Sequence, residues 1–323
     1  MIQIVIENIS IMFVYILIGY MLRRQRVMDE IVTKGLSYLL LKIAIPATII
    51  NATTSQPFAM ERLANMGIML GFSVVFFMGF TLLAWVIAKM LKMPANRQGV
   101  FAIAAGFSNV AFMGIPIISS IWGNAGVFYL SLVNIPFFVC LGIVTNWMLG
   151  PDPRTVGKSR QFRFRLDLNI TVAIIGLSIY LAQDTMPVEI LHVIRPTVVD
   201  GVGGGVIGRL ILQLSQLTTP VSMFVIGSSL GGSRLSDMPR DRSVYTLLLI
   251  SLLLFPVLVA LMTGFITDET LRGVLIMKTA MPSATLIAIF ADERQADGLY
   301  ASQVVLLTTV FSLLSIPLIT FLI

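Results

Sequence analysis

The sequence contains few charged residues, one cysteine and one histidine. Charged side chains make up 12% of the 323 residues, whereas a soluble domain has roughly 25%. Cys140, being alone, excludes an intrachain disulfide and a cysteine-based metal cluster. His192, also alone, excludes a His-rich metal site and argues against a catalytic triad built on histidine. We therefore expect a protein that is not an enzyme and that holds no cofactor or metal.

Hydrophobic residues dominate instead. They make up 57% of the chain, and the mean hydropathy is +0.93. At about 20 residues per spanning helix, this length allows roughly ten spans. The sequence thus predicts an all-α, polytopic membrane protein, with a glycine-rich interfacial or re-entrant connection at 186–206. The expected spans are residues 4–22, 36–53, 66–90, 99–120, 125–148, 169–183, 207–231, 243–266, 272–290 and 299–321.

Basic residues fall mainly on one side of these spans. Cytoplasmic loops carry the excess of Lys and Arg, so that side is predicted to be cytoplasmic and both termini non-cytoplasmic. Such loops explain the net charge of +6 without nucleic acid. We expect a multi-pass protein of the plasma membrane, the inner membrane in a bacterium. The basic residues of the predicted cytoplasmic side are Arg23, Arg24, Arg26, Lys34, Lys89, Lys92, Arg97, Arg154, Lys158, Arg160, Arg163, Arg165, Arg234, Arg240, Arg242 and Arg294, and those of the other side are Arg62, Arg195 and Arg272.

Residues 101–116, FAIAAGFSNVAFMGIP, would make a poor membrane helix. The run is apolar, but it contains two glycines and Asn109 and it ends in Pro116, which weakens a continuous helix. In lipid, an interrupted backbone persists only where protein or a water-filled cavity covers its N–H and C=O groups. The stretch is therefore either half of a central substrate site or a packing face on which small residues let two helices approach.

Short similarities relate the two halves of the chain. LKIAIPATIINATTS at 41–55 resembles LSQLTTPVSMFVIGSS at 214–229, which pairs Pro46 with Pro220. At nearly the same spacing, RQGVFAIAA and GVFYLS of the first half resemble LRGVLIMKT and GLYASQ of the second. Five spans in each half give the halves opposite orientations in the membrane. We expect a five-plus-five inverted repeat of residues 1–149 and 169–323, joined by a basic cytoplasmic connection at 150–168.

The repeat gives the interrupted stretch a counterpart. Ser108–Asn109 corresponds to Pro282–Ser283, within a second interrupted apolar run at 277–290. The interrupting residues of that run are Thr279, Pro282, Ser283 and Thr285. Two interrupted helices at equivalent places in inverted halves indicate a transport site near the bilayer midplane.

The two interrupted runs lack acidic and histidine side chains. Residues 101–120 and 273–289 contain no Asp, Glu or His, although a cation or proton exchanger would normally need one there. The composition favours an anion, held by Asn109, by backbone N–H groups at half-helix ends and by Lys278.

Three polar side chains near these runs have two interpretations. Lys278 lies one helical turn before Pro282, where it either faces the protein interior or snorkels to the nearer surface. Asn134 and Gln303, in the spans that follow, either hydrogen-bond across the site or hold helices together.

Three segments resemble the auxin efflux carrier family: SNVAFMGIPI at 108–117, TPVSMFVIGSSL at 219–230 and AMPSAT at 280–285. The family includes plant auxin exporters and bacterial permeases for malate, malonate and similar acids. The similarity in arrangement runs the full length of the chain. Its more specific elements are the Asn-x(4)-Gly-x-Pro pattern that ends in Pro116 and the Met-Pro at 281–282.

The resemblance implies a ten-helix fold like that of sodium/bile-acid symporters, in which the broken fourth and ninth helices cross. It implies a scaffold of spans 1, 2, 6 and 7 and a transport domain of spans 3–5 and 8–10 that slides like an elevator. Pro116 and Pro282 would be the crossover prolines, and Asn109 the substrate-contacting asparagine. Two features depart from plant members: Ser283 stands where a second asparagine is expected, and the long cytoplasmic loop is absent.

We expect a secondary transporter of small organic anions, carboxylates such as malate, malonate or auxin-like acids, that works by elevator-type alternating access. Its partners would be the anion and the lipid bilayer; a homodimer and coupling to a sodium or proton gradient are compatible with the sequence. The alternatives are a transporter-like receptor that binds without net flux, and a cation-coupled antiporter. The predicted substrate-binding residues are Ser108, Asn109, Gly114, Pro116, Asn134, Lys278, Pro282, Ser283, Thr285 and Gln303, and the hinge or crossover prolines are Pro46, Pro116, Pro220 and Pro282.

Overall fold

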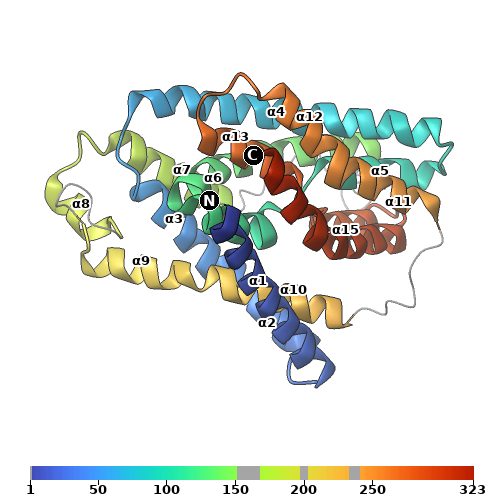
Figure 1. Ribbon diagram of the computed structural model, residues 1–323, viewed down its shortest axis with the longest axis horizontal. Helices are drawn as coiled ribbons and strands as arrows, with labels where there is room; N and C mark the ends of the chain where they lie inside the picture. Colours follow the sequence, from blue (N-terminus) through green and yellow to red (C-terminus); the bar gives the residue numbers. More distant parts are fainter. Residues whose placement is uncertain (1, 151–167, 197–202, 233–240) are drawn as a thin grey trace, which may run out of the picture. The chain divides into compact units, whose positions relative to one another are not determined.

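The computed structural model describes residues 2–150, 168–196, 203–232 and 241–323 (Figure 1). Within these ranges the chain is helical and contains no strand, which confirms the predicted all-α membrane protein. Of the predicted basic connection at 150–168, only the two end residues are described. The helical segments of the described chain that are long and apolar enough to cross a membrane are Glu30–Thr54, Met60–Met90, Val110–Met148, Val206–Gly232, Arg242–Met262 and Gly298–Leu322, with a shorter apolar helix at Leu168–Ala182.

The chain forms two compact units by its internal contacts. Unit 1 comprises Met1–Ile68, Ala111–Ile135 and Leu166–Ser233, and unit 2 comprises Met69–Val110, Pro136–Arg165 and Arg234–Ile323. Two helices are shared between the units, α4 (Met60–Met90) and α6 (Ile115–Met148). The inverted repeat and the division into scaffold and transport domains stay predictions.

The helices of the two units are as follows. Unit 1 contains α1 (Ile2–Arg24), α2 (Glu30–Leu39), α3 (Ile45–Thr54), α7 (Leu168–Ala182), α8 (Val188–Ile194), α9 (Val206–Gln216) and α10 (Thr218–Gly232). Unit 2 contains α5 (Ala95–Gly106), α11 (Arg242–Leu249), α12 (Phe255–Met262), α13 (Glu269–Thr279), α14 (Leu286–Glu293) and α15 (Gly298–Ile319).

Several predicted spans differ from the helices observed. The run expected at 207–231 is divided at Leu217 into α9 and α10, and the run expected at 272–290 is divided into α13 and α14. Those last two helices have 11 and 8 residues, too few for either to cross a bilayer alone. The boundary expected between 120 and 125 is marked by Gly123, whose φ of 55° and ψ of −143° interrupt α6. The connection expected at 186–206 contains α8, and its residues 197–202 lie outside the described ranges.

Glycines let α1 and α10 pack closely along each other in unit 1 (Figure 1). A Cβ atom on Gly19 would lie 2.5 Å from the carbonyl oxygen of Phe224, and one on Gly227 would collide with the carbonyl oxygen of Ile16. Since lipid tails are as apolar as leucine, such close backbone packing is what holds membrane helices together.

Replacing Gly227 with alanine should therefore destabilise unit 1, because the obstructing atoms are backbone and cannot turn away. We expect a loss of about 1–3 kcal/mol, as for other overpacked sites, measured as a lower thermal midpoint in detergent. Gly35→Ala is the matched control in the same unit, since nothing lies within 4 Å of the added Cβ. Equal midpoints for the two variants would contradict the packing argument.

In the described ranges, three short π-helical stretches let helices continue through a proline. They cover Leu40–Ala44, Val110–Gly114 and Ile250–Leu254, and each ends two residues before a proline. The prolines are Pro46, Pro116 and Pro256. Proline lacks an N–H and its ring clashes with the carbonyl four residues earlier. A wider π turn removes that clash without ending the helix.

Polar contacts join α3 to α9 and the start of α10 in unit 1. The hydroxyls of Thr48 and Thr218 are 2.6 Å apart, and Asn51 Nδ2 donates to Ser215 Oγ at 3.3 Å. Pro220 lies in the first turn of α10, where its missing N–H costs no helical hydrogen bond. Pro46 and Pro220, which the predicted repeat makes equivalent, thus lie in helices α3 and α10 of unit 1. Thr48 of α3 and Thr218 of α10, each two residues from one of these prolines, are hydrogen-bonded to each other.

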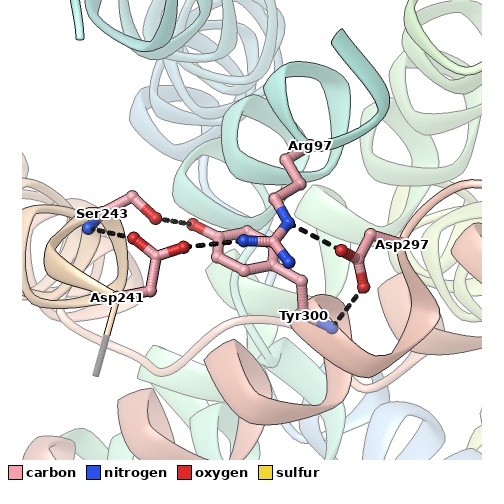
Figure 2. Close-up of polar contacts among 5 residues, drawn as sticks. All are labelled: Arg97, Asp241, Ser243, Asp297 and Tyr300. Carbon is pink, nitrogen blue, oxygen red and sulfur yellow. Dashed lines mark hydrogen bonds and ion pairs between the residues drawn. The ribbon is translucent and has the colours of Figure 1, made fainter. Parts of the chain in front are cut away.

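Arg97 connects the first turn of α5 to the N-termini of α11 and α15 in unit 2 (Figure 2). Arg97, in the first turn of α5, donates from Nε to Asp297 at 2.6 Å and from Nη1 to Asp241 at 2.8 Å. Asp241 accepts the Ser243 N–H at the start of α11, and Asp297 accepts the Tyr300 N–H at the start of α15. The guanidinium therefore holds two N-cap carboxylates at once.

Both carboxyl groups lie just before their helices and have lowered pKa values. Partial burial works against ionisation of Asp241, but hydrogen bonds from Ser243 and the charge of Arg97 outweigh it and lower its pKa below the usual 3.8. Burial likewise opposes ionisation of Asp297, and the Tyr300 N–H and Arg97 outweigh it, so that this pKa is lowered as well.

The Arg97 network should make stability depend on acid. A carboxyl group with a lowered folded-state pKa stabilises the fold above its unfolded-state pKa, and this stability is lost as pH falls through the folded-state value. Arg97→Gln should therefore lower the thermal midpoint at pH 7 by about 2–4 °C, roughly 1 kcal/mol for partly exposed pairs. As pH falls below 3.8, the difference from wild type should disappear. A constant difference across thermal scans from pH 7 to pH 3 would contradict this.

Candidate functional site

The two interrupted runs meet in unit 2 as a pair of short extended segments. α5 ends at Gly106, and Phe107 is extended, with φ of −115° and ψ of 106°. Ser108 pairs with Ser283 in an antiparallel bridge. The bonds on either side run from the Asn109 N–H to the Pro282 oxygen, 2.7 Å, and from the Ala284 N–H to the Phe107 oxygen, 2.9 Å. Residues 108–109 and 282–283, which the predicted repeat makes equivalent, are therefore in direct contact.

The sequence explains why both helices stop at this crossing. Pro282 has no N–H to continue α13 and disfavours helical backbone in the residue before it. Gly106 is the last residue of α5 and packs against α4. A Cβ atom on Gly106 would collide with the hydroxyl oxygen of Thr81 on α4. The backbone groups that leave the two helices then bond to each other, as the bilayer interior requires.

The crossing lies where four helix ends meet. α5 and α13 end at Gly106 and Thr279, and helical backbone resumes at Val110 and at Leu286. The N–H groups of a first helical turn have no partner within the helix and carry partial positive charge. Because residues 101–120 and 273–289 contain no acidic side chain, no carboxylate from these runs competes for those groups. The arrangement is suited to an anion.

Ser283 is held by hydrogen bonds on the second strand of the crossing. Its hydroxyl donates to the Ala104 carbonyl at 2.7 Å, and its N–H donates to Thr308 Oγ1 at 3.1 Å. Thr308, on α15, also donates to the Val304 carbonyl at 2.8 Å. These contacts join the segment that follows α13 to α5 and α15.

Ser108 and Asn109 occupy the first strand of the crossing. Both are buried, with 6% and 7% of their surfaces exposed. The backbone N–H of Asn109 donates to the Pro282 oxygen, so the main chain of this residue takes part in closing the bridge. The hydroxyl of Ser108 has no hydrogen-bond partner among the described residues.

Lys278 is wholly buried in unit 2, with 0% of its surface exposed. Its Nζ lies 3.3 Å from Ser73 Oγ and 4.4 and 4.3 Å from the ring centres of Phe76 and Phe77, all on α4. Within the described residues it makes no ion pair. The ammonium therefore faces the protein interior, one of the two predicted orientations, and does not snorkel. Aromatic faces stabilise such a cation by about 0.5–2 kcal/mol each.

Only some of the predicted site residues belong to the crossing in unit 2. Thr285 is exposed at the N-cap of α14, and Gln303 is partly exposed on α15. Gly114, Pro116 and Asn134 belong to unit 1, where Asn134 is 7% exposed on α6. The residues that unit 2 places in one crossing are Ser108, Asn109, Pro282 and Ser283.

The family model for "Membrane transport protein" matches residues 4–162 and 166–320, nearly the whole chain. The chain belongs to this family. The resemblance to auxin efflux carriers is thereby confirmed. A membrane transport protein of this family is a transporter and not an enzyme, and with its apolar helices the chain is a multi-pass membrane protein.

Two relatives match this membrane transport protein almost from end to end. One, from Methanothermobacter thermautotrophicus, is 23% identical over 320 residues, which cover 97% of this chain and 96% of the relative. The other, from Methanocaldococcus jannaschii, is 24% identical over 327 residues, with the same coverage. Both are described as uncharacterized transporters.

Sequence reasoning missed the residues that support the crossing. Thr308 lies on α15 and the aromatic pair Phe76 and Phe77 lies on α4, whereas the Ala104 carbonyl belongs to α5 itself. A threonine in an apolar helix is a weak signal, because most such hydroxyls bond to their own helix. Phe76 and Phe77 are consecutive residues of a long apolar helix, and nothing in that sequence indicates that they contact a lysine.

Proposed function

We propose that this membrane transport protein is a secondary transporter of small organic anions, carboxylates such as malate, malonate or auxin-like acids. The observation that carries the proposal is the crossing of two interrupted helices at Ser108 and Ser283. Interrupted helices at equivalent positions are the usual place where a secondary transporter binds its substrate.

The charge at the crossing favours an anion over a cation. The two runs that form it contain no acidic side chain and one basic side chain, Lys278. First-turn N–H groups after residues 109 and 285 add partial positive charge. In the proposed site, Asn109 donates from its amide to the carboxylate, and Lys278 supplies a positive field from behind the aromatic rings of α4.

We further propose that transport occurs by elevator-type alternating access, with unit 2 carrying the substrate. The hydrogen bonds of the crossing and the Arg97 network all lie inside unit 2, which favours its moving as one body. A gradient of sodium or protons would supply the driving force. Sodium could be held by backbone carbonyls at the ends of α5 and α13, since no carboxylate is present in those runs.

Uptake by proteoliposomes tests the proposal. Labelled malonate, malate and indole-3-acetate are offered with and without a sodium gradient and with and without a pH gradient. Uptake of one of these acids, and its acceleration by unlabelled acid on the other side, is expected. Saturable binding with no counterflow would instead identify a receptor. Sodium or proton flux that proceeds without any acid would identify a cation antiporter, and either result would overturn the proposal.

A further inference from the structure

Two serines face each other at the crossing, although the predicted repeat makes Ser108 equivalent to Pro282 and Asn109 equivalent to Ser283. The bonds from Asn109 to Pro282 and from Ala284 to Phe107 flank the Ser108–Ser283 pair without joining it directly. In antiparallel pairing this is the arrangement in which the Cα atoms approach most closely, and opposite side chains lie on the same face. The two hydroxyls therefore start from neighbouring positions on one face of the crossing.

The hydrogen bonds of the two serines are nevertheless different. Ser283 uses its hydroxyl on the Ala104 carbonyl and its N–H on Thr308, so both of its donors are occupied. Ser108 is 6% exposed, and its hydroxyl has no partner in the described part of the chain. Its own carbonyl accepts the Val110 N–H at 3.0 Å.

A buried hydroxyl without a partner needs a physical reason. Such groups are uncommon in native proteins, because burial removes the hydrogen bonds to water and no other bond replaces them, and a functional role is one of the recognised reasons. The residue before Ser108, Phe107, stacks on Phe77 at 4.9 Å and meets Phe137 at 5.5 Å. The residue after Ser108 is Asn109, and helical backbone begins at Val110; these are the groups expected to hold the anion.

We propose that Ser108 is the serine that contacts the substrate, and that Ser283 is a positioning residue that keeps the crossing closed. The Ser108 hydroxyl donates to a carboxylate oxygen of the anion when the anion is bound. The two halves of the site then have different roles. Ser108, in the first half of the chain, binds the substrate, and Ser283, in the second half, keeps the two extended segments of the crossing in place. This inference rests on the proposed function.

The test compares Ser108→Ala with Ser283→Ala in two measurements. In proteoliposomes, using whichever of malonate, malate or indole-3-acetate the wild type takes up, Ser108→Ala should raise KM about tenfold or more, the effect of losing a hydrogen bond to a charged group. Its thermal midpoint in detergent should equal or exceed that of wild type, since no protein contact is lost. Ser283→Ala should lower the thermal midpoint and the maximal rate and change KM less than threefold.

A second variant protects the test against misfolding. Ser108→Cys keeps nearly the same volume with a weaker donor, and it should raise KM less than Ser108→Ala does. An unchanged KM in Ser108→Ala, with uptake present in wild type, would overturn this inference alone. A larger KM effect in Ser283→Ala than in Ser108→Ala would also overturn it. Wild type that takes up none of the acids would instead overturn the proposed function, and the role of Ser108 with it.

Discussion

Asn109→Ala is expected to lower carboxylate uptake by about 100-fold and to leave the protein folded. The side-chain amide is the proposed donor to the substrate carboxylate, and hydrogen bonds to charged groups contribute about 1.5–3 kcal/mol, up to a factor of about 100. The crossing itself should survive, because it is the backbone N–H of Asn109 that binds the Pro282 oxygen, at 2.7 Å. Initial uptake rates in proteoliposomes measure the effect, and size-exclusion profiles report folding.

Two variants make the Asn109 result specific. Asn109→Asp keeps the shape but adds a negative charge, so it should be at least as inactive as Asn109→Ala. Asn96→Ala removes an exposed asparagine from the same helix, α5, and should transport like wild type. Wild-type uptake by Asn109→Ala would remove this asparagine from the site.

Lys278→Met is expected to reduce anion uptake at least tenfold without reducing stability. Methionine fills a similar volume against Phe76 and Phe77, and replacing a buried charge with a hydrophobic residue is often neutral or stabilising. Loss of the positive charge should lower the uptake of anions, since Lys278 is the only basic residue of the two interrupted runs. Uptake rates and thermal midpoints are measured on the same preparation.

The pairing of these two results separates two roles for Lys278. Lower uptake with an unchanged or raised thermal midpoint supports a long-range effect of the charge on the anion. Unchanged uptake with a changed midpoint would mean that the lysine only packs against α4. Lys278→Arg should keep part of the uptake, because it keeps the charge, although the larger guanidinium fits the aromatic contacts less well.

The interruptions in the two membrane helices could be predicted because they depend on local chemistry. Pro282 and the glycine and polar residues at 106–109 weaken a helix wherever they occur, and the lipid environment makes the weakness conspicuous. The similarity of the two halves then indicated which interruption faces which. The bridge joins Ser108 to Ser283, whereas the predicted repeat made Ser108 equivalent to Pro282 and Asn109 equivalent to Ser283.

The support of the crossing could not be predicted, because it depends on contacts between distant parts of the chain. Ser283 and Thr308 are 25 residues apart, and Lys278 and Ser73 are 205 apart. The local sequence does not show which of Ser108 and Ser283 has a hydrogen-bonded hydroxyl, since both are serines in an interrupted apolar run. Their difference arises only when Ala104 and Thr308 are placed beside one of them.

The Arg97 network shows a similar limit. Asp241 and Asp297 each precede an apolar helix, and a reader of the sequence could expect both to cap it. That one arginine from α5 reaches both carboxylates, at 2.8 and 2.6 Å, follows from the packing of three helices. Sequence reasoning assigned Arg97 only to the positive side of the membrane.

The π-helical stretches before Pro46, Pro116 and Pro256 also change the direction in which later side chains point. An α-helix turns about 100° per residue, and a π turn accommodates about one residue more than an α turn. Each stretch therefore shifts the angular phase of everything after it by about 100° relative to an uninterrupted α-helix. Apolar stripes drawn on the two sides of such a stretch do not align on a single helical wheel. For the helix that begins at Val110, the extra residue in the π-helical stretch thus sets which side chains point in a given direction. Deleting one residue from Val110–Gly114 would rotate the following helix by about 100° without changing the residues on its faces.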